Sequence, residues 1–452
     1  MATVTRTAPS LDLRRRSGRW IDHWVPEDPA FWASAGRTVA RRNLVFSIFA
    51  EHIGFSVWLL WSIVVVRLGA AGWQLGLSQA LWLTAVPSGV GALLRLPYTF
   101  AVPRFGGRNW TVVSALLLLV PCGGLAWAVG HPEIGYPALL GIAATAGVGG
   151  GNFASSMANI SFFYPEREKG WALGLNAAGG NLGVAVVQFA VPKLIVLGGG
   201  LALARAGLVY IPLAVIAAGC AFLFMDNLGE AKADPGPVRD SLRHSDTWVM
   251  SLLYIGTFGS FIGYSAAFPT LLTGVFHRAD LALSWAFAGA ATGSVARPLG
   301  GRLADRFGGA RITAVSFVLL AAGAYAGVWS VQQRSLPAFL AAFGCLFVAT
   351  GIGNGSTYRM IPRIFLVKGE DTGGDADTML RMRRTAAGAL GVISAVGALG
   401  GFAVPIAYAW SRSAFGSIEP ALWFYLGFFV VLLAVTWTAY LRPGSRLARA
   451  GV

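Results

Sequence analysis

The chain has 452 residues, of which 55% are hydrophobic and only 12% are charged. A soluble protein carries about twice that charged fraction, so the composition excludes an ordinary soluble enzyme or binding domain. The formal net charge of +15 would suit a nucleic-acid-binding protein. The basic residues, however, are spread over alternate loops and do not form one patch, so we predict no nucleic-acid partner.

Long apolar runs begin after the polar first 42 residues and recur almost to the end of the chain. About 20 helical residues cross the hydrocarbon of a bilayer. In lipid the backbone must satisfy its own hydrogen bonds, so these runs are expected to be helices. We predict 12 spans, at 43–66, 77–101, 111–130, 136–163, 171–196, 205–226, 247–276, 281–301, 312–330, 335–364, 385–410 and 417–441.

Basic residues mark one side of the predicted bundle. The first 42 residues and the loops on the same side hold Arg14, Arg15, Arg16, Arg41, Arg42, Arg104, Arg108, Arg167, Lys169, Arg302, Arg306, Arg311, Arg381, Arg383 and Arg384. The opposite loops hold far fewer cations. Because Lys and Arg are enriched in cytoplasmic loops, we predict a multi-pass membrane protein whose basic side faces the cytoplasm. It would contact membrane lipid and have both termini in the cytoplasm.

Motifs for cofactor chemistry are missing from the sequence. There is no G-x-x-x-x-G-K-[ST] loop for nucleotide phosphates and no cluster of residues with metal-ligand spacing. We therefore predict no cofactor, no metal and no enzymatic activity.

The sequence repeats itself at nearly one spacing, of 202 to 204 residues. "RFGG" occurs at 104–107 and again at 306–309, and Arg95 and Arg297 are likewise 202 residues apart. "GVGGG" at 147–151 is echoed by "GIGNG" at 351–355. Two similar six-span halves around a central path are the plan of many secondary transporters. The predicted divisions are a basic N-terminal segment (1–42), an N-terminal half (43–226), a linker (227–246), a C-terminal half (247–441) and a tail (442–452).

Several stretches resemble known transporters. "GGRLADRFGGAR" (300–311) resembles the loop motif of the major facilitator superfamily, and "VPRFGGR" (102–108) is a copy without the aspartate. "GGGNFASSMANISFFYP" (149–165), "KGWALGLNAAGGNLGV" (169–184), "GIGNGSTYRMIPRIF" (351–365) and "SAVGALGGFAVP" (394–405) resemble the nitrate/nitrite porter (NarK-like) family. Within its span-five glycine signature, Ala178, Gly179 and Leu182 depart from the usual pattern. The resemblance covers about 43–441.

This resemblance implies an all-α membrane protein with the major facilitator superfamily fold, in which 12 transmembrane helices form two pseudo-symmetric six-helix halves. It also implies a secondary transporter of nitrate and nitrite that works by alternating access.

Two arginines inside predicted spans are the first candidate site residues. An arginine at the centre of a bilayer costs about 2.5–3.5 kcal/mol on insertion scales, so Arg95 and Arg297 need a reason to be there. Each could snorkel or pair with a carboxylate. Alternatively, the planar and always charged guanidinium groups could clamp a planar anion. The resemblance implies that both arginines bind the substrate.

The resemblance also places aromatic and amide side chains around the anion. It implies Phe55, Phe153 and Phe258 as walls, and Tyr254 and Asn181 as hydrogen-bond donors. Tyr254 and Phe258 are four residues apart and share one helix face. The alternative for each phenylalanine is ordinary packing.

Glycine clusters in the spans predict close helix contacts and do not by themselves require a ligand. Small residues allow helices in a membrane to approach and slide past one another. The positions assigned to this role are Gly149, Gly151, Gly180, Gly183, Gly353 and Gly355. Asp305 is assigned the electrostatic role of the loop motif.

The first span carries two titratable residues, Glu51 and His52, and intramembrane titratable groups are functional hypotheses by default. Glu51 lies four residues before Phe55 and faces the same way. It could form a static ion pair with Arg95. It could instead carry a proton, because burial favours the neutral carboxyl while Arg95 favours the carboxylate. His52 points elsewhere and is the weaker candidate.

These residues favour proton-coupled nitrate symport by a monomer, with nitrate, nitrite and a proton as partners. Nitrate/nitrite antiport is the main alternative, and both modes can be electroneutral. That matters because moving one charge across the membrane costs about 2.3 kcal/mol per 100 mV. A membrane anion sensor that does not transport is the alternative from another class.

Overall fold

The computed structural model describes residues 15–229, 231 and 236–452. Arg14, with the rest of residues 1–14, and positions 230 and 232–235 of the predicted linker lie outside the described residues. The N-terminal part contains β1 (Arg15–Arg16), η1 (Ser17–Arg19), β2 (Trp20–Ile21), α1 (Pro29–Phe31), η2 (Trp32–Gly36), α2 (Arg37–Trp58), α3 (Trp61–Val64), η3 (Val65–Ala71), α4 (Leu77–Phe105), α5 (Gly107–Leu117), α6 (Leu119–Ala128), η4 (Pro132–Ile134), α7 (Gly135–Thr145), α8 (Gly147–Phe163), α9 (Glu166–Leu194), α10 (Arg205–Leu208), α11 (Tyr210–Phe224) and β3 (Asn227–Leu228).

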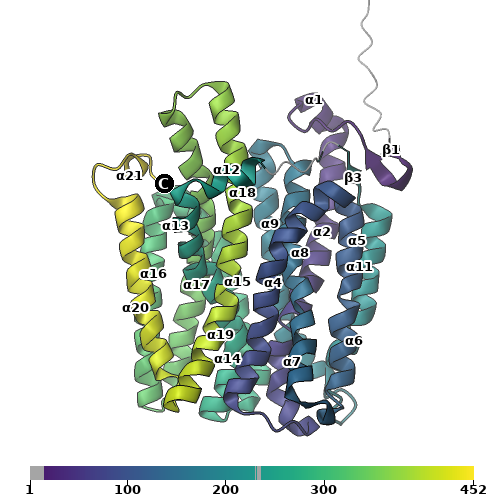
Figure 1. Cartoon of the computed structure of the whole chain (residues 1–452), viewed down its shortest axis with the longest axis vertical. Coiled ribbons are helices and arrows are strands. Elements are labelled where there is room, and N and C mark those ends of the chain that lie inside the picture. The colour runs from purple at the N-terminus through teal and green to yellow at the C-terminus, as the bar shows by residue number, and fades with distance from the viewer. Residues whose placement is uncertain (1–14, 230, 232–235) are drawn as a thin grey trace, which may run out of the picture.

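The C-terminal part contains α12 (Gly236–Leu242), α13 (Ser245–Tyr254), η5 (Ile255–Gly259), α14 (Ser260–Phe276), α15 (Ala279–Phe307), α16 (Gly309–Gln332), α17 (Leu336–Asp371), α18 (Ala376–Ala398), α19 (Gly400–Phe415), α20 (Glu419–Thr436), η6 (Trp437–Leu441) and α21 (Arg446–Arg449). We call α2 to α11 the N-terminal half and α13 to η6 the C-terminal half. The two halves stand side by side, purple to teal and green to yellow in Figure 1.

The twelve predicted spans are all helical. Among the described residues, eleven continuous helical stretches are long and apolar enough to cross a membrane. The twelfth span is α15, a 29-residue helix made more polar by Arg297 and by its small hydroxyl and glycine residues. The structure thus agrees with a bundle of twelve transmembrane helices.

The helices depart from the predicted spans in two ways. Regular α-helix is interrupted inside seven spans: near Leu59, Leu118, Ala146, Val209 and Leu399, and at the π-helical turns η5 and η6. In addition, α17 continues to Asp371 and α18 begins at Ala376, so this hairpin projects beyond the bundle at the end that carries the termini (Figure 1). The residues of this hairpin are polar, so the predicted spans 335–364 and 385–410 do not include them. The helices continue nevertheless, because a helix does not have to end where it leaves the lipid.

The halves contact each other at the end of the bundle opposite the termini. There Ser78 on α4 donates to the carbonyl of Ala409 on α19 at 3.2 Å, and Gln188 on α9 donates to the carbonyl of Ser265 on α14 at 2.7 Å. Between the level of Arg95 and the terminal end, the described residues form no hydrogen bond, ion pair or ring contact from one half to the other. The polar and ring contacts between the described halves therefore lie at the far end and at the level of Arg95.

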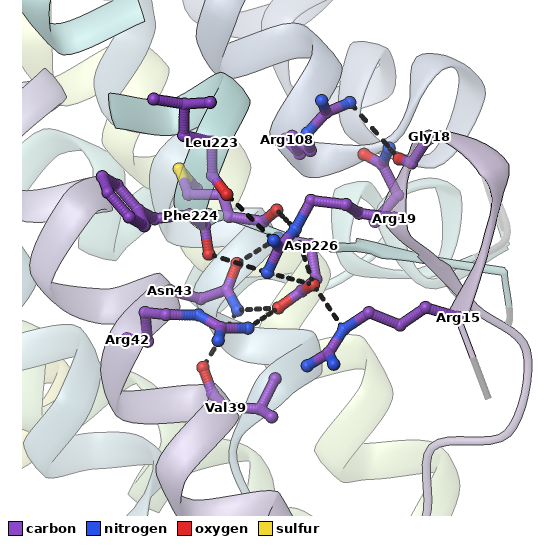
Figure 2. Close-up of polar contacts among 12 residues, drawn as sticks. Arg15, Gly18, Arg19, Val39, Arg42, Asn43, Arg108, Leu223, Phe224 and Asp226 are labelled. Carbon is purple, nitrogen blue, oxygen red and sulfur yellow. Dashed lines mark hydrogen bonds and ion pairs between the residues drawn. The ribbon is translucent and has the colours of Figure 1, made fainter. Parts of the chain in front are cut away.

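A buried carboxylate ties the start of the chain to the N-terminal half. Asp226 follows α11, is fully buried and accepts hydrogen bonds from Arg15, Arg19, Arg42 and Asn43 (Figure 2). The same Arg19 donates to carbonyl groups at the end of α11, which have no partner within their own helix. Next to this cluster, β2 pairs with β1 and, in parallel, with β3. We call Asp226 and its four partners the Asp226 clamp.

Candidate anion site between the two halves

Arg95 lies fully buried in the middle of the bundle and reaches from α4 across to the other half. Its Nη1 donates to the hydroxyl of Ser394 on α18 at 2.6 Å and to the Ser394 carbonyl at 3.0 Å. Its Nε contacts the carbonyl of Gly150 on α8 at 3.4 Å. The buried Nη2 has no partner. The Nε and Nη1 groups of this guanidinium are therefore held by protein acceptors, and the N–H groups of Nη2 remain available to a ligand.

Arg297 occupies the corresponding place on α15, with 6% of its surface exposed. The two guanidinium groups are close enough for their charges to act on each other. Arg297 lies 5.4 Å from the centre of the Tyr358 ring on α17. Its Nη1 and the Tyr254 hydroxyl are both buried and make no hydrogen bond of good geometry, although the two side chains lie within reach of each other. Each half thus contributes one buried arginine with an unused N–H group.

A continuous row of aromatic rings connects the two arginines. Neighbouring ring centres are 5.1, 6.0, 6.1, 5.2 and 6.5 Å apart along the series Trp58, Phe55, Phe153, Phe258, Tyr254 and Tyr358. The Cζ of Arg95 lies 4.5 Å from the Phe153 ring centre and 5.0 Å from that of Phe258, which is cation–π range. Phe258 lies in the π-helical turn η5, a rare geometry that is frequent at functional sites. The predicted aromatic residues are brought together.

This arrangement suits a small planar anion. A buried donor left without a partner costs about 1–3 kcal/mol, and this region holds three such groups, on Arg95, Arg297 and Tyr254. Rings that exclude water and a few convergent polar groups are the usual composition of a small-ligand site. In the described part of the chain, no group of three or more His, Cys, Asp or Glu residues could hold a metal ion.

Asn181 is less closely tied to this region. It is buried on α9, and its Oδ1 has no partner. The described residues form no contact between Asn181 and either arginine, so its predicted role as a donor to the anion stays a prediction.

Glu51 lies fully buried on α2, beside the anion site but not paired with it. Its Oε2 accepts hydrogen bonds from the hydroxyl of Ser156 on α8 and from Nδ2 of Asn176 on α9, the latter at 2.6 Å. Its Oε1 has no partner. Arg95 and Arg297 act on Glu51 through their charge, but no ion pair joins these described residues, so the static Glu51–Arg95 pair is absent here.

His52 points in a different direction from Glu51. Its Nδ1 lies 3.0 Å from the carbonyl of Gly179 on α9, so a protonated Nδ1 donates to that carbonyl. It has no contact with the arginines in the described residues.

The predicted glycines lie where helices or side chains approach closely. A Cβ added at Gly149 would lie 2.1 Å from the Gly54 carbonyl oxygen, and one at Gly355 would lie 2.1 Å from that of Arg297. The corresponding distances are 2.5 Å from Gly180 to Glu51 Oε1, 2.4 Å from Gly183 to the His52 carbonyl, 2.7 Å from Gly353 to Thr257 and 3.0 Å from Gly151 to Leu94. All six positions are therefore filled by a neighbour. Gly180 alone makes room for the Glu51 carboxylate.

Asp305 forms an ion pair with Arg359 and so joins α15 to α17. Both side chains are more than half exposed, and exposed pairs contribute only about 0–1 kcal/mol. The pair lies at the terminal end of the bundle, away from the arginines.

Five residues near the site were not predicted from the sequence. Trp58 and Tyr358 extend the aromatic row, Ser394 holds Arg95, and Ser156 and Asn176 hold Glu51. A signal was available for four of them, since Ser156, Asn176, Tyr358 and Ser394 lie inside the stretches that carry the family resemblance. Trp58 follows Phe55 by one helical turn.

Comparison with known proteins agrees with this architecture. The family model of the Major Facilitator Superfamily matches residues 44–368. The nitrate/nitrite transporter NarU of Salmonella typhimurium is 40% identical over 445 residues, which are 93% of this chain and 96% of the relative. NarU of Escherichia coli is 39% identical, covering 96% and 98%. The probable nitrate/nitrite antiporter NarK2 of Thermus thermophilus is 34% identical, covering 96% and 99%.

Solved structures support the same fold. A D-xylose-proton symporter superimposes with a TM-score of 0.63 at 16% identity, covering 87% of this chain and 96% of that one. A bacterial homologue of the human lysosomal transporter Spinster, in an inward-facing and occupied conformation, superimposes with a TM-score of 0.64 at 14% identity, covering 88% and 96%. The chain therefore belongs to the major facilitator superfamily and, within it, to the family of the nitrate/nitrite transporters NarU and NarK, which are transporters and not enzymes.

Proposed function

We propose that this protein moves nitrate and also nitrite across the bacterial cytoplasmic membrane by alternating access. It acts as a monomer of two six-helix halves, with both termini in the cytoplasm. The observation that carries the proposal is the pair of buried arginines, Arg95 and Arg297, one from each half, each with an unused N–H group. Because the site is shared between halves, rocking one half against the other exposes a bound anion to either side in turn.

The choice of anion is supported by the relatives and by the chemistry of the site. NarU and NarK2 are named for nitrate and nitrite. A planar oxyanion can accept from the planar guanidinium groups while lying against the rings of Phe153 and Phe258.

We favour proton coupling, and the surroundings of Glu51 support it. An anion bound between Arg95 and Arg297 cancels the positive charge that acts on Glu51, so the carboxylate becomes less favourable and takes up a proton. By linkage, the proton favours anion binding by the same factor. Anion and proton then travel together as a neutral pair, which removes the cost of about 2.3 kcal/mol per 100 mV for a lone charge.

Nitrate/nitrite antiport is the second candidate. It is favoured by the name of the Thermus thermophilus relative, which is a probable nitrate/nitrite antiporter. Exchange of one anion for another is also electroneutral, and it would leave Glu51 without a transport role.

The decisive experiment is nitrate uptake into proteoliposomes under an imposed pH gradient, acidic outside, with and without internal nitrite. Symport predicts accumulation without internal nitrite and its loss when the gradient is collapsed. Uptake that requires internal nitrite and ignores the gradient would establish antiport instead. Binding without uptake under either condition would leave the anion sensor. Protein-free liposomes are the control.

A further inference from the structure

We infer that Glu51, Ser156 and Asn176 together form one proton-binding site, in which the Ser156 hydroxyl stabilises the Glu51 carboxyl in both its charged and its neutral form. The inference rests on the proposed proton coupling and deepens it. Ser156 and Asn176 act through Glu51 and are positioning residues.

The geometry identifies the atom that takes the proton. Glu51 Oε1 has no hydrogen-bond partner and is covered by Gly180, whose added Cβ would lie 2.5 Å away. Glu51 Oε2, by contrast, contacts Ser156 and Asn176. A proton on Oε1 would be a buried donor without an acceptor, whereas a proton on Oε2 has the Ser156 oxygen beside it. Oε2 is therefore the protonation site.

The Ser156 hydroxyl has three polar neighbours but only one proton to donate. It contacts Glu51 Oε2, Nδ2 of Asn176 at 2.9 Å, and the Phe153 carbonyl one helical turn away at 3.1 Å. Because the amide nitrogen Nδ2 of Asn176, which faces the hydroxyl, can only donate, the serine proton goes either to Glu51 Oε2 or to the Phe153 carbonyl.

These two choices match the two forms of Glu51. When Glu51 is a carboxylate, Ser156 donates to Oε2. When a proton has bound to Oε2, Glu51 donates to the Ser156 oxygen, and the serine proton rotates to the Phe153 carbonyl. No covalent bond other than the new O–H of Glu51 forms or breaks, and no heavy atom has to move. Both forms stay hydrogen-bonded in a fully buried place, where an unpartnered group would be costly.

The serine also links the proton to the anion site. Phe153, whose carbonyl receives the serine proton in the neutral form, carries the ring that lies 4.5 Å from the Arg95 guanidinium. The proton site and the anion wall therefore share one turn of α8.

Three other charged or titratable groups interact electrostatically with Glu51. They are Arg95 on α4, Arg297 on α15 and Tyr358 on α17. On its own helix, the ring nitrogen of His52 is turned to the Gly179 carbonyl. The donors on α8 and α9 are the neutral Ser156 and Asn176. A change at either donor should therefore act on Glu51 without adding or removing a charge.

The test is the pH profile of nitrate accumulation in proteoliposomes for Asn176→Ala and Ser156→Ala. Asn176→Ala removes a donor that favours the carboxylate, because hydrogen bonds to ionised groups are the stronger ones. Glu51 then holds its proton more tightly, and half-maximal uptake should move to alkaline pH by about one unit, or tenfold in proton affinity. Ser156→Ala removes a donor from the charged form and an acceptor from the neutral form. Its shift should therefore be the smaller one, while accumulation falls about tenfold because both forms have become costly.

Three further variants keep the test falsifiable. Ser156→Thr retains the hydroxyl and should restore accumulation. In a Glu51→Gln background neither alanine should shift the pH profile of the remaining anion flux, since no titrating group is left for them to act on. Ser161→Ala, on the same helix but bonded only to the Ala158 carbonyl, should behave like the wild type.

Two outcomes would overturn the inference by itself: a shift for Ser156→Ala as large as that for Asn176→Ala, or unchanged profiles for both while the wild type accumulates nitrate. A wild type that shows no gradient-driven uptake would overturn the proposed coupling and the inference with it. Nitrate/nitrite exchange, which needs no net proton movement, reports in every variant whether a folded transporter is present.

Discussion

Asp226 and Glu51 are both fully buried carboxylates in the N-terminal half, yet their surroundings are opposite. Asp226 forms ion pairs with Arg15, Arg19 and Arg42 and is also held by Asn43. Glu51 has two neutral donors, one oxygen without a partner, and no ion pair among the described residues. Three cations pair directly with Asp226 and make it a structural tie, whereas Glu51 is held by neutral donors only. This difference is consistent with a structural role for Asp226 and with the proposed proton-binding role for Glu51.

The arginines give the largest expected effect. Arg95→Lys should lower nitrate transport about 100-fold, because lysine keeps the charge but loses the planar fork, and each lost hydrogen bond to a charged group is worth about 1.5–3 kcal/mol. Arg297→Lys should do the same. Uptake into proteoliposomes measures both. Arg42→Lys in the Asp226 clamp is the matched control and should retain most activity. Equal losses of transport in all three variants would show that Arg95 and Arg297 have no greater part in transport than Arg42.

Glu51→Gln tests whether the second carboxylate really changes its charge. Glutamine is nearly isosteric and cannot release a proton, so accumulation driven by a pH gradient should be lost. Nitrate binding and some exchange should remain, since they need no net proton movement. Accumulation equal to that of the wild type would exclude Glu51 as the proton carrier. Equal damage to accumulation and exchange would point to a structural role for Glu51 instead.

Asp226→Asn tests the clamp. It leaves Arg15, Arg19 and Arg42 near one another without their common partner, so the free energy of unfolding should fall by about 3 kcal/mol. Thermal unfolding in detergent, followed by tryptophan fluorescence, measures this. Asp22→Asn removes a carboxylate from an exposed pair with Arg16 and should cost less than about 1 kcal/mol. If both changes lower the free energy of unfolding equally, the buried ion pairs of Asp226 stabilise the protein no more than the exposed pair of Asp22 does.

Gly180→Ala gives the smallest effect and acts on Glu51 by shape alone. The new Cβ would meet Glu51 Oε1 at 2.5 Å, and overpacking of this kind costs about 1–3 kcal/mol. Gradient-driven uptake should fall severalfold more than exchange. Gly174→Ala, on the same helix with open space around it, should leave both unchanged. Identical behaviour of the two variants would show that Gly180 does not confine the carboxylate.

The sequence made some of these features predictable because their physical cost is local. Arg95, Arg297 and Glu51 interrupt apolar runs, and a charge in a membrane span stands out in any reading of the chain. The spans themselves follow from hydropathy. Ser156 and Asn176 lie in stretches that carry the family resemblance, but their composition does not mark them as site residues. A neutral polar residue in a glycine-rich helix is common, and the partner of each lies on another helix. The clamp cannot be predicted from the local sequence either, since Asp226 and Arg15 are separated by 211 positions.

That separation has a consequence for biosynthesis. A ribosome adds about 5–20 residues per second, so Asp226 is made roughly 10–40 s after Arg15. During that interval Arg15, Arg19 and Arg42 do not yet have Asp226 to bind, and the first span can enter the membrane before this end of it is fixed. The clamp can close only when the sixth span has been synthesised. The clamp is thus a late contact in the assembly of the N-terminal half.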